Sequence, residues 1–277
     1  MKILNGSELV GYIKERQAKQ VRGLRQAWRV FPKLAIIIAS DNPVIDTYVR
    51  LKQRYGEDIL IDVAIYRVEQ TEVKALIQTL NNDVSVHGIV VQLPLADASE
   101  TDAIVTMIAP EKDVDGLAGA QAQYTSATAT AIDWLLAGYN VTLRGKKIAI
   151  VGNGRLVGAP LAALWREQGL DVTVYDDTVP SLDALRLANV IVTATGVPGL
   201  ITSAMVGPSA VVVDAGTASE NGVIVGDVAA DVRERGDITI TPEKGGVGPL
   251  TIAALFDNVI TAARKTADDD SGLPASA

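Results

Sequence analysis

The first part of the chain switches repeatedly between helical and extended spacing of its apolar residues. Leu9, Ile13, Val21 and Leu24 share one helical face, which predicts an amphipathic helix over residues 7–29. Further along, the apolar pattern predicts strands at 34–38, 59–65 and 88–92 and helices at 43–56, 71–82 and 99–108. Strands that alternate with helices in this way predict a parallel sheet covered by helices.

The alternation resumes after residues 116–130, which are small and polar and predict a segment between domains. The predicted strands are 148–151, 172–175, 190–193, 211–214 and 238–240, and the predicted helices are 156–168, 182–187 and 251–264. From Thr266 the tail is short and acidic, so we expect it to be disordered. The two series together predict an α/β protein of two domains.

The composition fits a folded two-domain protein and excludes several kinds of site. Of 277 residues, 48% are hydrophobic and 21% are charged. The absence of cysteine excludes disulfides and thiolate chemistry. Because His87 is the single histidine, a histidine-ligated metal or a Ser-His-Asp triad is nearly excluded. We expect His87 to be structural.

The charge of the chain bears on its partners. A formal net charge of −8, without clustered Lys or Arg, argues against nucleic acid or an anionic membrane. The N-terminus has no signal-peptide core, and the apolar runs are far shorter than the roughly 20 residues that a spanning helix needs. We therefore expect a soluble, cytoplasmic protein.

A glycine-rich turn directly follows the predicted strand 148–151. Gly152-Asn153-Gly154-Arg155-Leu156-Val157-Gly158 precedes a predicted helix, and its glycines would let the backbone approach a pyrophosphate at the helix N-terminus. The G-x-G-x-x-x-G spacing is one residue longer than the common fingerprint, so a tight structural turn stays open as the alternative. The predicted dinucleotide contacts are Gly152, Asn153, Gly154, Arg155, Val157 and Gly158, with Thr195 and Gly196 after the strand 190–193.

Two carboxylates follow the next predicted strand. An acidic residue about 20 positions beyond the glycines typically bonds the adenosine ribose hydroxyls, and Asp176 and Asp177 occupy this place. Their charge would repel a 2′-phosphate, which favours NAD over NADP. Either aspartate could instead cap the turn at Ser181.

Three segments of the first half carry polar side chains that we expect to converge above the ends of the parallel strands. They are Tyr48–Lys52, Val90–Leu95 and Pro110–Gly116. Tyr48 and Lys52 are four positions apart, so their side chains share a helix face. Partial desolvation beside an aromatic ring would lower the pKa of Lys52 enough for acid–base work. On chemistry alone, a solvated surface lysine is the favoured alternative.

These segments resemble the signature blocks of the bifunctional methylenetetrahydrofolate dehydrogenase/methenyltetrahydrofolate cyclohydrolase family. The blocks are Val-Gln-Leu-Pro-Leu at 91–95, Lys-Asp-Val-Asp-Gly at 112–116 and Gly-Gly-Val-Gly-Pro at 245–249, and the similarity extends over residues 1–264. The resemblance implies oxidation of methylenetetrahydrofolate to methenyltetrahydrofolate with NAD(P), followed by hydrolysis to formyltetrahydrofolate.

The resemblance also assigns roles to individual residues. Lys52 would be the catalytic lysine of the cyclohydrolase step, Tyr48 would stack on the folate ring system, and Gln92 would hydrogen-bond Lys52. The other implied substrate contacts are Asp115 at the pterin and Gly248, Pro249 and Thr251 between folate and nicotinamide.

The domain plan follows from the same resemblance. Residues 1–122 would form a catalytic folate domain, completed by the last helix at 250–265. Residues 123–249 would form a Rossmann-type dinucleotide-binding domain, with a cleft between the two domains, and 266–277 would be the disordered tail. The family forms homodimers through the dinucleotide domain and requires no metal.

Four departures from the family pattern bear on the cofactor and on the second activity. Gly152-Asn153-Gly154 replaces Gly-Arg-Ser and Asp176-Asp177 replaces His-Ser, and both changes favour NAD because groups that grip a 2′-phosphate are gone. Ser126–Ala129 replaces Pro-Cys-Thr-Pro beside the cleft, and Ile45 replaces a serine that assists the cyclohydrolase step.

Three alternatives follow. Ile45 leaves open a monofunctional NAD-dependent dehydrogenase with weak or no cyclohydrolase activity. The intact set of Tyr48, Lys52, Gln92 and Asp115 argues against a binding protein without turnover. A Rossmann oxidoreductase of amino or hydroxy acids would not explain residues 245–249.

Overall fold

The chain folds into two α/β units, each assembled from two separate stretches of sequence. The computed structural model describes residues 1–41, 43–179, 181–220 and 223–271. The three-stranded unit comprises residues 11–127 and the chain from Ile252 onward, and the six-stranded unit comprises residues 1–10 and 128–251. The helices that cross from one unit into the other along the chain are α1 (Gly6–Gly23), α5 (Ala127–Gly138) and α8 (Val247–Ser271).

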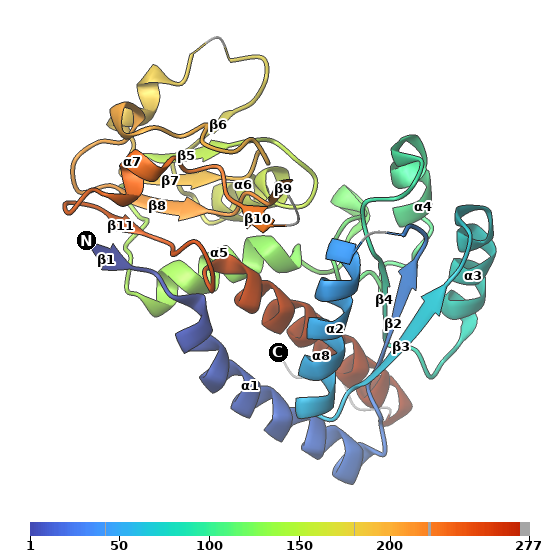
Figure 1. Cartoon of the computed structure of the whole chain (residues 1–277). Coiled ribbons are helices and arrows are strands. Elements are labelled where there is room, and N and C mark those ends of the chain that lie inside the picture. Colours follow the sequence, from blue (N-terminus) through green and yellow to red (C-terminus); the bar gives the residue numbers. More distant parts are fainter. Residues whose placement is uncertain (42, 180, 221–222, 272–277) are drawn as a thin grey trace. The chain divides into compact units, whose positions relative to one another are not determined.

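A short parallel sheet forms the centre of the three-stranded unit. Strand β2 (Lys33–Ile38) lies between β3 (Asp62–Arg67) and β4 (Gly88–Val91) and pairs in parallel with both. Helices α3 (Gln70–Asn82) and α4 (Thr101–Val105) lie on one side of this sheet, and α2 (Pro43–Asp58) and α8 lie on the other (Figure 1). Because helices cover both faces, β2 is an almost continuous apolar run.

Periodic apolar residues hold α3 on the sheet. Val73, Ile77 and Leu80 recur at helical spacing and are at most 2% exposed. They pack in one core with Ala35 and Ile37 of β2. The pattern that predicted the helix is therefore the pattern that buries it.

Helix α8 supplies the other half of this core. Its Phe256 ring stacks on Tyr55 of α2, with ring centroids 5.1 Å apart. Gly56 and Gly88 permit the close approach, because a Cβ at either position would lie 3.3 Å from Phe256 or 3.2 Å from Val259 and still closer to other atoms. The three-stranded unit therefore requires a helix from the far end of the sequence.

One parallel sheet also forms the centre of the six-stranded unit. Its order is β1-β11-β8-β7-β5-β6, and each neighbouring pair is parallel (Figure 1). The strands are β1 (Lys2–Ile3), β5 (Ile148–Val151), β6 (Val172–Tyr175), β7 (Val190–Thr193), β8 (Val211–Asp214) and β11 (Thr239–Ile240). The chain goes from β5 to β6 on one side and then to β7 on the other. In such sheets ligands bind at this change of direction, outside the carboxyl ends of the strands.

Helices and a small ribbon complete the six-stranded unit. Trp165 of α6 (Gly158–Glu167) is fully buried and donates its indole N–H to Asp133 of α5 at 2.9 Å. Helix α7 (Ala230–Arg233) is short, and β9 (Ala218–Glu220) pairs with β10 (Val223–Val225) in an antiparallel ribbon. The sequence did not predict α7, this ribbon or β1.

Some predicted bounds in the three-stranded unit differ from the structure. Strand β3 begins at Asp62 rather than at 59, because Ile59 and Ile61 are buried in a turn where Leu60 adopts φ +66°. Alternation of apolar residues therefore extended across a buried turn as well as a strand. The predicted helix 99–108 is reduced to a 3-10 turn at Ala98–Glu100 followed by α4.

The first predicted helix also ends differently. Helix α1 ends at Gly23 and passes into a π-helical turn at Leu24–Trp28, which Arg29 terminates with φ +58°. Its apolar spacing continues through both kinds of turn, so periodicity alone did not mark the change.

Both terminal regions depart from the predicted domain plan. Lys2 and Ile3 pair with Thr239 and Ile240 of β11, and residues 1–10 therefore belong to the six-stranded unit. Helix α8 begins at Val247 and is helical as far as Ser271, whereas disorder was expected from Thr266. Ala267 is 3% exposed, so part of the expected tail is packed. Residues 272–277 lie outside the described residues.

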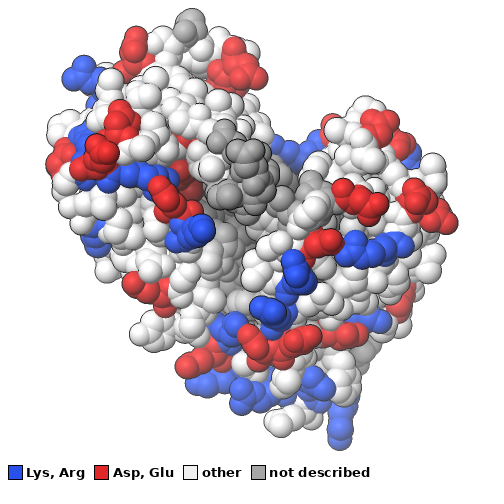
Figure 2. All heavy atoms as spheres, viewed as in Figure 1, with Lys and Arg blue, Asp and Glu red and all other residues white. Residues whose placement is uncertain are grey.

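The surface shows mixed charge. Acidic and basic side chains are interspersed over the face seen in Figure 2. Within the described ranges, no helix is both long and apolar enough to cross a membrane.

Candidate active site

Helix α2 presents Tyr48 and Lys52 on one face, one turn apart. Lys52 is only 8% exposed, so the alternative of a solvated surface lysine does not hold. Tyr48 is half-buried, and burial raises the pKa of its hydroxyl. Lys52 is thus removed from bulk water, and Tyr48 is partly shielded from it.

Gln92 meets Lys52 from the end of β4. Its backbone N–H donates to Ile37 at 2.8 Å, which extends the sheet ladder by one residue and fixes the start of the side chain. Lys52 Nζ donates to Gln92 Oε1 at 2.9 Å, and Gln92 Nε2 donates to the Leu93 carbonyl at 3.2 Å. The bond between Lys52 and Gln92 agrees with the expectation from the sequence.

Asp115 stands on a rigid turn. The buried Asp113 carboxylate accepts the backbone N–H groups of Leu117 at 3.3 Å and Ala118 at 2.9 Å. Gly116 adopts φ +68°, and a Cβ there would lie 2.6 Å from the Tyr124 carbonyl oxygen. Asp113 therefore holds the turn, and Asp115 is the carboxylate of this block that remains for a ligand.

Burial dominates the electrostatics of Lys52 and Asp115. Desolvation lowers the pKa of Lys52, although attraction to Asp115 opposes the shift. Desolvation likewise raises the pKa of Asp115, and attraction to Lys52 opposes it. Both groups are thus shifted toward their neutral forms. A lysine in this state can accept a proton closer to neutral pH than an exposed lysine can.

The glycine-rich turn of the six-stranded unit has the shape of a cradle. Gly152 adopts φ +97° directly after β5 and donates its N–H to Tyr175 at 2.7 Å. A Cβ at Gly158 would overlap the Gly152 carbonyl oxygen, so the start of α6 packs directly on the turn. At Gly154 a Cβ would meet nothing within 4 Å, which leaves open space over the backbone. These features fit the approach of a pyrophosphate to the N-terminus of α6.

The residues around the turn differ in their hydrogen bonds and in their exposure. Asp176 accepts bonds from the Thr178 backbone at 3.1 Å and hydroxyl at 2.6 Å, and from Asn153 Nδ2 at 3.4 Å. These hydrogen bonds, above all those from Thr178, hold the pKa of the Asp176 carboxyl below its usual value. Asp177 is exposed, and Arg155 and Val157 are partly exposed. Asp176 is therefore the carboxylate held beside the turn.

Thr195 and Gly196 lie in the loop that follows β7. A Cβ at Gly152 would lie 2.6 Å from the Ala194 carbonyl oxygen and 3.2 Å from the Thr195 methyl group. Gly196 adopts φ +70° in the same loop. The structure therefore places the β7 loop against the glycine-rich turn.

Gly248, Pro249 and Thr251 lie in the first turns of α8, because that helix begins at Val247 rather than near Thr251. Gly248 is exposed, and the other two are half-buried. The preceding Gly245 adopts φ +82° and accepts the Ser7 backbone N–H at 3.0 Å. The family block at 245–249 is thus a helix start.

Two of the departures from the family pattern, Ile45 and the segment 126–129, contain buried residues. Ile45 is 2% exposed in α2. Ser126, Ala127 and Ala129 are each at most 3% exposed at the start of α5.

His87 accepts the Lys33 backbone N–H through Nδ1 at 3.2 Å, and burial lowers its pKa, as fits a structural histidine.

Sequence reasoning missed a buried polar network in the six-stranded unit. It contains Asp214, Asp227 and Arg233. Asp214 ends a predicted apolar strand, and this position was the available signal for it. Asp227 follows a strand that the sequence did not predict, so no such signal existed for it. In the described part of the chain, no group of three or more His, Asp or Glu side chains is arranged to hold a metal.

Both halves of the chain match models of one family. Residues 4–115 match the tetrahydrofolate dehydrogenase/cyclohydrolase catalytic domain. Residues 126–267 match the tetrahydrofolate dehydrogenase/cyclohydrolase NAD(P)-binding domain. The matches fall on the segments that carry the two groups of candidate site residues.

Similar proteins extend over nearly the whole chain. The bifunctional protein FolD of Lactobacillus helveticus is 37% identical over 281 residues, which cover 96% of this chain and 99% of that protein. The crystal structure of the bifunctional FolD methylenetetrahydrofolate dehydrogenase/cyclohydrolase from Campylobacter jejuni has a TM-score of 0.89 at 36% identity, covering 96% of this chain and 99% of that one. The Trypanosoma brucei methylenetetrahydrofolate dehydrogenase-cyclohydrolase, complexed with NADP and an inhibitor, has a TM-score of 0.87 at 29% identity, covering 95% and 97%.

Proposed function

The chain belongs to the tetrahydrofolate dehydrogenase/cyclohydrolase family, and on this basis we propose that it oxidises methylenetetrahydrofolate to methenyltetrahydrofolate with NAD(P) and then hydrolyses this product to formyltetrahydrofolate. The observation that carries the proposal is the buried Lys52, bonded to Gln92 and electrostatically coupled to Asp115. The bifunctional relatives named above support the pairing of the two activities.

The first reaction asks the protein mainly for orientation. A bound dinucleotide supplies the acceptor for the hydride that leaves the bridging methylene carbon. Gly152, Gly154 and Gly158 would hold its pyrophosphate, and Asp176 would bond its adenosine ribose. Tyr48 would stack on the folate ring system, and Asp115 would bind the pterin.

The second reaction needs proton transfers, and Lys52 is placed to take part. As water oxygen bonds to the methenyl carbon, one proton passes to the neutral Lys52 amine. The other proton goes to the ring nitrogen whose bond to that carbon breaks. The positive charge of the substrate thus ends on Lys52, and Gln92 Oε1 accepts a hydrogen bond from Lys52 Nζ and orients it.

We also propose that NAD is preferred to NADP. The support is local: Asp176 is held beside the glycine-rich turn by Thr178 and Asn153, with Asp177 exposed next to it. Two carboxylates at the ribose would repel a 2′-phosphate, and Asn153 and Gly154 replace the family's arginine and serine. Arg155 is the nearby cation that could reduce this repulsion.

We propose that the chain forms a homodimer through the six-stranded unit. Among the described strands, β6 lies at the edge of its sheet, a position from which a strand can pair with another chain. Sedimentation at several protein concentrations tests this proposal, and a monomer at every concentration would overturn it.

One spectrophotometric assay tests both the reaction and the cofactor. Methylenetetrahydrofolate is supplied with NAD or with NADP, and the reduced-nicotinamide and methenyl absorption bands are followed separately. We expect nicotinamide reduction that is faster with NAD, without lasting accumulation of methenyl product. Reduction with NADP alone would overturn the cofactor preference. Accumulation of the methenyl product without hydrolysis would instead indicate a monofunctional dehydrogenase, to which Ile45 points.

A further inference from the structure

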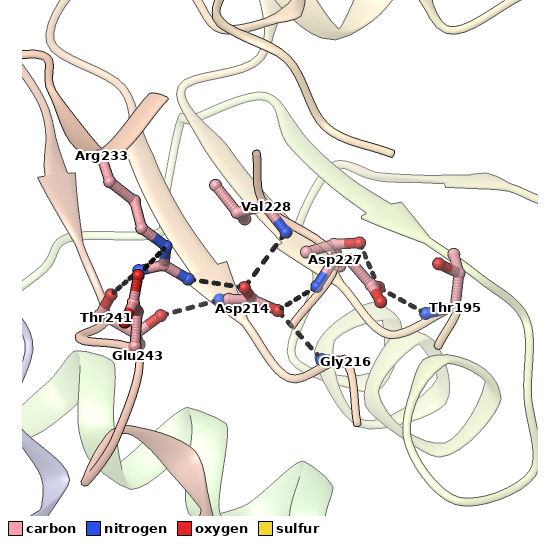
Figure 3. A network of polar contacts seen from close by, with 9 residues as sticks. Thr195, Asp214, Gly216, Asp227, Val228, Arg233, Thr241 and Glu243 are labelled. Carbon is pink, nitrogen blue, oxygen red and sulfur yellow. Dashed lines mark hydrogen bonds and ion pairs between the residues drawn. The ribbon is translucent and has the colours of Figure 1, made fainter. Parts of the chain in front are cut away.

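Asp214 ends strand β8 and is saturated with hydrogen bonds (Figure 3). Its Oδ1 accepts the backbone N–H groups of Gly216 at 3.1 Å and Asp227 at 3.0 Å. Its Oδ2 accepts the Val228 N–H at 3.2 Å and Arg233 Nη2 at 2.8 Å. Four donors converge on one carboxylate, so this side chain is committed to holding the surrounding backbone.

Asp227 is fully buried beside it and reaches the neighbouring strand. Its Oδ2 accepts the Thr193 hydroxyl at 2.7 Å and the Thr195 backbone N–H at 2.7 Å. Figure 3 shows Thr195 on the far side of Asp227 from Asp214. The carboxylate therefore ties the segment after β10 to the end of β7 and to the loop that follows.

Two glycines make this arrangement possible. A Cβ at Gly216 would overlap the Asp227 carboxylate, and a Cβ at Gly226 would overlap the Asp214 carboxylate. Each aspartate is thus seated against a glycine near the other aspartate in sequence. The reciprocal packing leaves little room for either carboxylate to move.

The network also reaches a third strand. Thr241 follows β11, and its hydroxyl accepts the Asp214 backbone N–H at 2.9 Å. Arg233 donates to the Thr241 carbonyl at 2.9 Å as well as to Asp214 (Figure 3). The carboxyl ends of β7, β8 and β11 are therefore tied together, and this is the edge at which a doubly wound sheet binds its ligand.

Asp227 lies at the point where the network meets the proposed dinucleotide site. The Thr195 segment that it holds packs on Gly152, as the close approach to Ala194 and Thr195 requires. Strand β7 is the first strand beyond the change of direction at β5, and β7 to β11 correspond to the second mononucleotide-binding half of such sheets. The loop after β7 thus borders the half that would receive the nicotinamide nucleotide.

We propose that Asp227 is a positioning residue for the nicotinamide half of the dinucleotide, acting through its hydrogen bond to the Thr195 N–H; this rests on the function proposed above. The bond keeps the β7 loop seated on the glycine-rich turn. Without it, the Thr195 backbone N–H in this loop loses its acceptor. The turn itself keeps its separate bond from Gly152 to Tyr175. The adenosine side is therefore independent of Asp227.

Three variants and two ligands test this role. Asp227→Ala removes the acceptor, Asp227→Asn keeps a carbonyl oxygen for Thr195 and Thr193, and Asp231→Ala is the control. Asp231 accepts the Ser203 backbone N–H at 3.0 Å in the same unit, so it matches the type of bond at another place. Calorimetry measures the dissociation constants of NAD and of 5′-AMP for each protein.

Asp227→Ala should weaken NAD binding by about tenfold or more, since the Thr195 N–H is left without its acceptor. Binding of 5′-AMP should stay within about twofold, and Asp227→Asn and Asp231→Ala should stay within about threefold of wild type for both ligands. Equal losses for NAD and 5′-AMP, unchanged NAD binding in Asp227→Ala, or a loss in Asp227→Asn as large as in Asp227→Ala would overturn the positioning role.

Two further outcomes are a variant that does not fold and a wild type that binds no dinucleotide. If Asp227→Ala does not fold, Thr193→Val takes its place. Thr193→Val removes one of the two donors to Asp227, and it should raise the NAD dissociation constant more than that of 5′-AMP; a parallel rise would overturn the proposal. Wild-type protein that binds no dinucleotide would contradict the proposed function together with this role.

Discussion

The two units use the carboxyl ends of their strands in opposite ways. In the three-stranded unit, Lys52 and Asp115 offer side chains whose charges burial suppresses, and Gln92 accepts a hydrogen bond from Lys52. In the six-stranded unit, glycines leave the backbone open at the turn, and the buried Asp214 and Asp227 carboxylates are bonded to backbone N–H groups. The three-stranded unit presents reactive side chains, and the six-stranded unit presents a backbone surface that a ligand can fit.

This difference suggests how the same strand-end geometry supports two tasks. A side chain whose protonation state is poised by burial can move a proton, so changing it should alter rates. A backbone surface freed of Cβ atoms recognises a ligand by fit, so changing it should alter affinity. The hydrogen bonds that Asp214 and Asp227 accept keep that surface in place. If the two tasks are separate, a change at one edge should leave the function of the other unaltered.

The largest effect is expected for Lys52→Met. The substitution keeps the length of the buried side chain and removes the amine, so hydrolysis of methenyltetrahydrofolate should fall by about 100-fold or more. The dissociation constant of NAD, measured by calorimetry, should stay the same. Lys74→Met, at an exposed lysine of α3 that pairs with Glu100, is the matched control and should leave both quantities unchanged. An active Lys52→Met would contradict the assignment of the proton acceptor.

A smaller effect is expected where a single methyl group is added to the other edge. Gly154→Ala meets nothing within 4 Å in the protein, so the melting temperature should not fall. The methyl group would occupy the proposed pyrophosphate space and should weaken NAD binding by about 1.4–2.8 kcal/mol, or about ten- to hundredfold. Hydrolysis of added methenyltetrahydrofolate should continue at the wild-type rate.

Substitutions at two other glycines serve as controls for Gly154→Ala. Gly23→Ala in α1 also meets nothing within 4 Å and should leave NAD affinity unchanged. Gly158→Ala would force its Cβ into the Gly152 carbonyl and should lower the melting temperature as well as the affinity. Unchanged NAD binding in Gly154→Ala would show that the ligand does not use this space.

The smallest effect is a displacement of a pH profile. Hydrolysis should increase with pH as Lys52 loses its proton, with a midpoint below the ordinary lysine value of 10.5, because burial lowers the pKa of Lys52. Asp115 attracts the Lys52 ammonium and raises that pKa, so Asp115→Asn should move the midpoint to lower pH. The measurement is kcat for hydrolysis at saturating substrate over a range of pH. A midpoint that moves upward would mean that Asp115 does not stabilise the charged lysine.

Much of the fold could be predicted because its strands are short blocks of apolar and β-branched residues. Strands β5, β6, β7 and β8 have the predicted bounds, since β5, β6 and β7 consist of apolar, aromatic or β-branched residues and β8 consists of three valines before Asp214. Strand β1 could not be predicted, because two residues carry no periodicity and depend on pairing with β11. The start of α8 at Val247 was not predicted, because Gly248 and Pro249 are typical of a loop. Pro is nevertheless compatible with the first turn of a helix.

The candidate site divides in a similar way. Motifs identified Lys52 and Gln92, and the hydrogen bond between them agrees with the expectation. The electrostatic coupling of Lys52 to Asp115 depends on a turn whose rigidity comes from Asp113 and Gly116. Asp227 could not be found from the sequence, because its bonds join segments 34 positions apart. Such long-range bonds follow from the strand order, which local patterns do not determine.

The chain crosses between the units within helices α1, α5 and α8, and this has a consequence for the order in which the units can be completed during synthesis. Most of the three-stranded unit, residues 11–127, precedes residues 128–251 in the chain, yet its sheet lacks the cover of Phe256 and Val259 until α8 has been made. The six-stranded unit ends at Thr251, before these two residues. A chain truncated after residue 251 would therefore contain the whole six-stranded unit together with an incomplete three-stranded unit, whose uncovered apolar face chaperones would have to shield.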